Sequence, residues 1–203
     1  MYRLVPLAVL LVMALVPTGT GAHTPSVVDG QSSSAADATV LDDPTLSRAI
    51  GATLEAPGET DWYRMDLLAG EPLVVGMTAP VASGAVAATF TLLGPGLPEA
   101  AGAGLEAALL AKEAGVDGAI VFEPASDPPT EIHGGLGFIN YGTLRLETPA
   151  DGSYFVAVRA VEPEATGKYV FAPGVREAFG LEAIGGMVDI IGFFDAPWPP
   201  EAP

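Results

Sequence analysis

Apolar and polar residues alternate with a period of two in two segments far apart in the chain, Asp61 to Leu68 and Ser153 to Ala160. A cluster of turn-forming residues precedes each segment. Alternation of this kind puts the apolar side chains on one face, which is typical of a half-buried β-strand. The apolar face comprises Tyr63, Met65 and Leu67 in the first segment and Tyr154, Val156 and Val158 in the second.

Similar apolar runs between Gly- and Pro-rich turns predict more strands. They are expected over residues 48–54, 73–78, 88–93, 118–123, 136–147 and 168–172, with a Pro/Asp/Gly-rich loop over residues 124–135. Short strands at this spacing favour a sandwich or barrel over βαβ units. We therefore predict an all-β fold, an antiparallel β-sandwich.

One segment has a helical pattern instead. From Leu105 to Ala114, the residues Leu105 and Leu109 share one helical face, and Gly115 follows where a helix-ending glycine belongs. The sequence therefore predicts a short helix inserted into the sandwich.

Three short motifs carry a resemblance to a known family. They are the strand beginning Asp61-Trp62-Tyr63, the stretch Ala150-Asp151-Gly152-Ser153-Tyr154, and Gly167-Lys168-Tyr169. Over residues 46–173, with an unusual insert near 94–117, the chain resembles the bacterial pre-peptidase C-terminal (PPC) domain, a small secreted β-sandwich. The resemblance implies a PPC-like, jelly-roll-like sandwich. Domains of this family commonly follow a peptidase, but this chain has no segment long enough to be one, so that association is not carried over.

Residues 1–22 are typical of a secretory signal peptide. Arg3 lies in a positive first region, Val5 to Val16 form an apolar core, and small residues precede a cleavage site between Ala22 and His23. The apolar core is shorter than the roughly 20 residues that span a bilayer. We expect a secreted, periplasmic or cell-surface protein. An uncleaved membrane anchor is the alternative.

The chain is strongly acidic, with 25 Asp and Glu against 8 Lys and Arg and a net charge of −17. Such a surface repels the phosphates of nucleic acids and anionic lipids, so neither is an expected partner. The acidity suits either solubility in a salty exterior or recruitment of divalent cations. The chain has no Cys, so its core must hold without disulfides.

The two ends differ from the middle. Residues 23–45 are rich in Ser, Ala and Asp without apolar periodicity, which predicts a disordered linker. Residues 174–203 form an apolar segment with a Pro-rich tail. Its stretch 179–194 is too short and carries too many acidic residues to span a bilayer. Four residues at helical spacing are expected to pack on the sandwich or dock on a partner: Leu181, Ile184, Val188 and Ile191.

Catalytic signatures are weak. His133 is the only histidine certain to lie in the mature core, and the chain has no Gly-x-Ser-x-Gly motif, so a serine hydrolase is not expected. Gly102 to Ala107 matches the spacing of a dinucleotide-binding turn, but no strand leads into it. With no Cys and one useful His, the chain is not expected to build a zinc or iron site. We predict that it is not an enzyme.

Two candidate binding features remain. Asp42, Asp43, Glu59 and Asp61 cluster where the sandwich begins, and their oxygens could hold calcium, as some PPC-like collagen-binding modules do near their N-terminal linker. A solvated acidic turn is the alternative. Trp62 faces opposite to Tyr63, so an exposed Trp62 ring could stack on a sugar or a peptide. A Trp62 ring buried under a loop is the alternative.

These features together predict an extracellular binding or adhesion module for protein or carbohydrate, with calcium as a candidate cofactor. The alternative is a structural accessory subunit that docks on an envelope partner or a membrane through residues 179–194.

Overall fold

The computed structural model describes residues 23–28, 32–82, 84–133, 135–177 and 181–199. The strands are β1 (Thr24–Val27), β2 (Thr39–Val40), β3 (Arg48–Leu54), β4 (Asp61–Leu67), β5 (Pro72–Pro80), β6 (Ala88–Glu99), β7 (Gly118–Val121), β8 (Thr130–His133), β9 (Leu136–Glu147), β10 (Gly152–Ala160) and β11 (Gly167–Pro173). The helices are α2 (Leu105–Ala114) and α3 (Leu181–Asp195), with short 3-10 helices η1 (Ala35–Asp37) and η2 (Ala100–Ala103).

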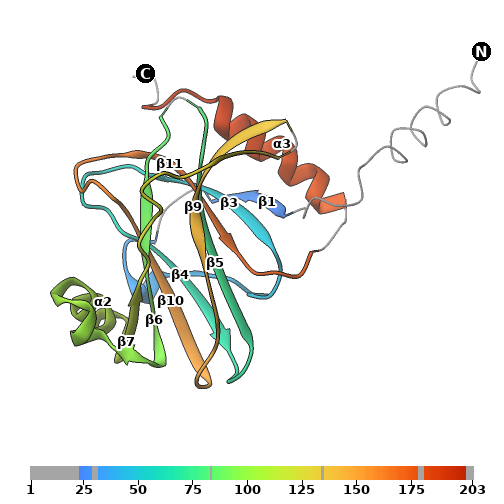
Figure 1. The fold of residues 1–203 in the computed structure, drawn as a ribbon. Coiled ribbons are helices and arrows are strands. Elements are labelled where there is room, and N and C mark those ends of the chain that lie inside the picture. Colours follow the sequence, from blue (N-terminus) through green and yellow to red (C-terminus); the bar gives the residue numbers. More distant parts are fainter. Residues whose placement is uncertain (1–22, 29–31, 83, 134, 178–180, 200–203) are drawn as a thin grey trace, which may run out of the picture.

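The strands form two sheets that face each other (Figure 1). Sheet A has six strands in the order β1-β3-β11-β5-β9-β8, and sheet B has five in the order β2-β4-β10-β6-β7. The core lies between the sheets, where the Tyr63 ring of sheet B stacks on the Phe171 ring of sheet A with 4.3 Å between centroids. The prediction of a mostly β fold with two sheets is confirmed.

The inner faces follow the alternation in the sequence. Residues at every second position of β4 and β10 are buried in the shared core, and β10 pairs antiparallel with both β4 and β6. The inserted helix has the bounds that the sequence predicts, and Gly115 ends it at a φ of 70°. This left-handed conformation favours glycine because it has no Cβ.

Two predictions about irregular segments are wrong. Residues 23–45, predicted as a disordered linker, contain β1, η1 and β2, and β1 pairs in parallel with β3. Residues 124–135, predicted as a loop, contain β8, which pairs with β9. All three strands lie at sheet edges, where backbone hydrogen bonds to one neighbour hold a strand whose side chains need no apolar pattern.

Helix α3 covers the outer face of sheet A (Figure 1). Ile190 and Phe194 are buried there, against Val170 of β11. The side chain of Lys168 crosses the same interface, where its ammonium donates hydrogen bonds to the carbonyl oxygens of Phe193 and Ala196. These donors satisfy carbonyl groups that the end of the helix leaves without intrahelical partners.

The predicted docking face of this helix is not the face that packs on the sandwich. Val188 is 68% exposed and Ile191 37% exposed, so neither packs on sheet A. The side chains of Leu181 and Ile184 lie outside the described residues, as does the whole predicted signal peptide, residues 1–22. Within the described part of the chain, neither helix has the length and apolar character that crossing a membrane requires.

Candidate functional site

A groove with a volume of about 780 Å³ runs between α2 and the outer face of sheet B. Its floor is formed by β6, β7 and β10, one wall by the start of α2, and the far end by the loops after β3 and β10. Figure 1 shows α2 standing beside β6 and β7 at one side of the sandwich. Cavities of roughly 300–1,000 Å³ are the usual size of small-ligand sites.

The floor of the groove carries short side chains. Thr91 of β6 lies directly opposite Ala157 of β10, and both line the groove. Helix α2 is held above the sheet by its buried residues Ala107, Leu110 and Ala111. The other side of the helix therefore points away from the sheet and toward the groove's opening.

Large aliphatic side chains surround the opening and are exposed to solvent. Leu105 is 78% exposed and Leu109 59% exposed on α2, and Val121 of β7 and Val161 after β10 are 43% and 41% exposed. They come from three separate segments of the chain. Single exposed apolar side chains are common on protein surfaces. Several that gather around one concave surface are typical of a binding site.

Charged groups in the groove are already paired. Arg159 of β10 forms an ion pair with Glu106 of α2. Glu59 lies at the other end, and its Oε2 accepts a hydrogen bond from the backbone N–H of Ala56 at 2.8 Å and another from that of Glu55. The groove therefore offers mainly apolar contact, with little unpaired charge.

Trp62 does not offer its ring to a ligand, which corrects that expectation. The side chain is 1% exposed, because it lies in a second core under η1 and α2, with Ala35 and Leu110. Phe155 meets it edge to face, with 6.4 Å between ring centroids. The alternation correctly placed Trp62 on the outer face of sheet B, and the inserted helix then covers that face.

The four carboxylates predicted as a calcium site are not brought together. Asp43 Oδ1 accepts a hydrogen bond of 2.7 Å from the Thr45 hydroxyl, and Asp43 also pairs with Arg176. The Thr45 bond is the main cause that lowers the pKa of Asp43. Asp61 is buried in the core, Asp42 is exposed, and Glu59 is bound to its own turn. Among the described residues no three His, Cys, Asp or Glu side chains gather as metal ligands.

Asp61 belongs to a buried chain of polar groups that the sequence did not indicate. Its Oδ2 accepts a hydrogen bond of 2.6 Å from the Tyr169 hydroxyl, which lies 2.8 Å from the Tyr63 hydroxyl. Its Oδ1 is buried and has no hydrogen-bond partner among the described residues. Burial is the main cause that raises the pKa of Asp61 to about 7, and the charges of Glu59 and Glu55 add to it. The Tyr169 bond opposes the shift.

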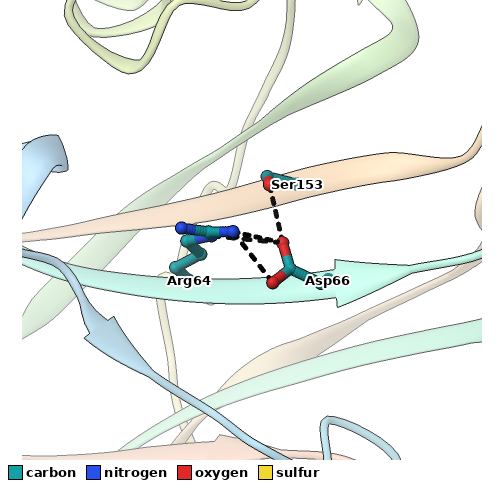
Figure 2. Close-up of polar contacts among 3 residues, drawn as sticks. All are labelled: Arg64, Asp66 and Ser153. Atoms are coloured by element: carbon teal, nitrogen blue, oxygen red, sulfur yellow. Dashed lines mark hydrogen bonds and ion pairs between the residues drawn. The ribbon is translucent and has the colours of Figure 1, made fainter.

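A polar cluster on the outer face of sheet B joins β4 to β10 (Figure 2). Arg64 donates to both carboxylate oxygens of Asp66, at 3.0 and 2.9 Å, and the Ser153 hydroxyl donates to Asp66 Oδ1 at 2.6 Å. The Ser153 bond is the main cause that lowers the pKa of Asp66. Because both oxygens already accept hydrogen bonds, this cluster stabilises the strand pair and is a poor ligand site.

His133 lies at the end of β8, and its Nε2 is 2.9 Å from Glu131 Oε2 on the same strand. Asn140 donates a hydrogen bond of 2.9 Å to the other oxygen of Glu131. A serine nucleophile would need a hydrogen bond to this imidazole. The contact that His133 makes in the described structure is with Glu131 and not with a serine. The prediction that the chain is not an enzyme stays a prediction.

No protein-family model and no curated protein matches this chain. A search of solved structures finds CorA, a surface-associated copper-binding protein important in copper acquisition by Methylomicrobium album BG8. The match covers 68% of this chain and 98% of that one at 14% identity, with a TM-score of 0.38. The likeness is to a bacterial β-rich fold at a coarse level, and at this score it carries no argument about function. The resemblance to the PPC domain stays a prediction.

Proposed function

We propose that this chain is an exported, non-catalytic, PPC-like binding module whose groove beside α2 holds an apolar segment of a protein ligand. The observation that carries the proposal is the set of exposed aliphatic side chains, Leu105, Leu109, Val121 and Val161, around one groove. Burying such side chains against a ligand contributes about 25 cal/mol per Å² of apolar area removed from water.

The composition of the groove favours protein over carbohydrate. Sugar binding relies on an exposed aromatic face, whereas the aromatic residue lining the groove, Phe90, is 1% exposed. Trp62 is buried as well. Aliphatic side chains of a peptide fit a surface of leucine and valine, and the paired charge of Arg159 gives no site for a free anion.

The proposal can be tested with a displayed library of random peptides and the mature protein. Selected peptides should be enriched in Leu, Ile and Val, and the double variant Leu105→Glu/Leu109→Glu should bind them at least tenfold more weakly. The matched control is Ile132→Glu, which changes an aliphatic residue 68% exposed on β8, outside the groove. Equal binding by the double variant, or equal loss in the control, would contradict the proposal.

A second candidate function rests on α3. Val188 and Ile191 stay exposed while Ile190 and Phe194 hold the helix on sheet A, so the exposed pair is free to contact an envelope partner. Val188→Glu/Ile191→Glu should then release the mature protein from the envelope fraction without lowering its melting temperature. A double variant that stays in the envelope fraction would remove this candidate.

A further inference from the structure

The groove beside α2 is lined by more negative than positive charge. Its charged side chains are Glu59, Glu106 and Arg159, and Arg159 is already paired with Glu106. Glu59 is half-buried at the other end, where its Oε2 accepts hydrogen bonds from the backbone N–H groups of Glu55 and Ala56. These donors are neutral, and among the described residues no Lys, Arg or His pairs with Glu59. Glu59 therefore brings to the groove a negative charge that no cation of the described chain neutralises.

Two loops form this end of the groove, and they are bonded to each other. Residues 55–60 join β3 to β4, and residues 161–166 join β10 to β11. The backbone N–H of Gly58 donates to the Pro163 carbonyl at 2.7 Å, and both residues line the groove. The Glu59 carboxylate closes the first loop through its bonds to residues 55 and 56. Backbone hydrogen bonds therefore hold Glu59 in place at the end of the groove.

The same loops carry acidic residues and no basic ones. Residues 55–60 include Glu55 and Glu59, residues 161–166 include Glu162 and Glu164, and neither loop contains Lys or Arg. Burial is the main cause that raises the pKa of Asp61 at the start of β4, and the charges of Glu59 and Glu55 add to it. The negative field of the first loop thus reaches well beyond its own residues. This end of the groove has a negative potential, which attracts cationic groups.

We propose that the ligand of the groove is a protein segment in which aliphatic residues stand next to an arginine or a lysine, and that Glu59 binds this cationic side chain. The inference rests on the proposed function and adds the chemistry of the partner. Val161, one of the exposed aliphatic residues of the groove, directly follows β10, so apolar contact continues up to the loops. A hydrogen bond between two ionised groups is among the stronger kinds, and it would fix the direction of the bound segment.

Charge complementarity separates this partner from others. An acidic residue at the same place would face Glu59 and the exposed glutamates of both loops, and like charges across an interface repel. The net charge of −17 attracts any cationic peptide, but such attraction does not depend on a single carboxylate. The inference therefore predicts a preference for basic peptides that depends on Glu59 itself.

The test uses three synthetic peptides that share the aliphatic core of a library-selected peptide. They carry two arginines, two glutamines or two glutamates beside the core, placed before it in one series and after it in another. Fluorescence anisotropy measures their affinity for the mature protein. In the tighter-binding series, the arginine peptide should bind at least about fivefold more tightly than the glutamine peptide, and the glutamate peptide most weakly. The difference should shrink from about 0.1 M to about 1 M salt, because the Debye length falls from about 10 Å to about 3 Å.

Glu59→Gln separates the groove carboxylate from the net charge. The amide oxygen of glutamine still accepts hydrogen bonds from residues 55 and 56, so the loop should keep its shape, which thermal melts and circular dichroism check. Glu147→Gln is the matched control, because it removes the same charge from an exposed position at the end of β9 in sheet A, outside the groove. The preference for arginine should be lost in Glu59→Gln and keep its size in Glu147→Gln.

A preference of the same size in the two variants would overturn the inference, because the net charge alone would then attract the arginine peptide. Equal affinity of the unchanged protein for the arginine and glutamine peptides would overturn it as well. In both cases the proposed function stands if Leu105→Glu/Leu109→Glu weakens binding of the glutamine peptide. If that double variant binds the glutamine peptide as the unchanged protein does, the groove is not the site and both proposals fail.

Discussion

Tyr169 of sheet A donates a hydrogen bond to Asp61 of sheet B, with 2.6 Å between the hydroxyl and Oδ2. The Tyr63 hydroxyl lies 2.8 Å from that of Tyr169 and completes a polar chain inside the sandwich. A buried carboxylate without a cationic partner is expensive in its charged form. This explains why the pKa of Asp61 rises to about 7, far above its usual value of 3.8.

The raised pKa predicts that Asp61 makes the protein less stable at alkaline pH. The folded state holds the proton more tightly than the unfolded state, so the contribution of Asp61 is complete below pH 3.8 and is lost as the pH rises through about 7. Each unit of pKa difference corresponds to about 1.4 kcal/mol. The free energy of unfolding, measured with urea, should therefore fall between pH 5 and pH 8.

Asp61→Asn provides the control for this prediction. Other carboxylates also titrate, and the net charge of −17 adds its own dependence on pH. Because the amide does not titrate, the difference in stability between the two proteins isolates Asp61. That difference should shift in favour of the variant by about 2–4 kcal/mol from pH 5 to pH 8. A difference that is the same at both values would show that Asp61 titrates normally.

Tyr154 is predicted to hold the turn before β10 as well as the core. Its ring is fully buried, and its hydroxyl donates to the carbonyl oxygens of Ala150 at 2.8 Å and Pro95 at 3.0 Å. Tyr154→Ala should lower the free energy of unfolding by about 3–5 kcal/mol, the range for large aromatic deletions. Tyr154→Phe should cost about 1 kcal/mol, because only the hydrogen bonds are lost. Urea melts of both variants measure the two contributions, and equal losses would contradict this division.

Gly94 lies under the same ring, and a methyl group there is predicted to disturb it. A Cβ at Gly94 would lie 2.2 Å from Tyr154 Cδ1, so the ring or the strand must move. Gly94→Ala should destabilise the fold by about 1–3 kcal/mol, as overpacking does. Gly102→Ala is the matched control, because a Cβ there meets nothing within 4 Å. Equal effects of the two substitutions in thermal melts would argue against the close contact.

Two glycines of α3 are predicted to respond oppositely to alanine. A Cβ at Gly186 would lie 1.9 Å from the Pro25 carbonyl oxygen, so alanine there must push α3 away from β1. A Cβ at Gly192 meets nothing within 4 Å, and alanine in a helix is favoured over glycine by about 1 kcal/mol. Gly186→Ala should lower the melting temperature and Gly192→Ala should raise it slightly. A Gly186→Ala protein as stable as the original would mean that α3 does not rest on β1.

The sequence predicts the strands well wherever a side-chain pattern reflects burial. β3 and α2 have the predicted bounds, because turn-forming residues follow the first and Gly115 ends the second. Strands β1 and β2 were missed because backbone pairing holds them at sheet edges without an apolar pattern.

The candidate sites were harder to predict. In α2, the face of Leu105 and Leu109 looks like a core face, but the residues that pack on the sheet are Ala107, Leu110 and Ala111. The residues that line the groove are distant from one another in the sequence, so no single sequence motif predicts the groove.

The most direct test of the proposed function is nuclear magnetic resonance of the mature protein with methyl-labelled Ile, Leu and Val, titrated with a selected aliphatic peptide. The account predicts that the methyl signals of Leu105, Leu109, Val121 and Val161 shift as the peptide binds, because these side chains surround the groove. The signals of Ile132, Val188 and Ile191 should stay in place. Shifts confined to Val188 and Ile191 on α3, with those of the groove unchanged, would contradict it.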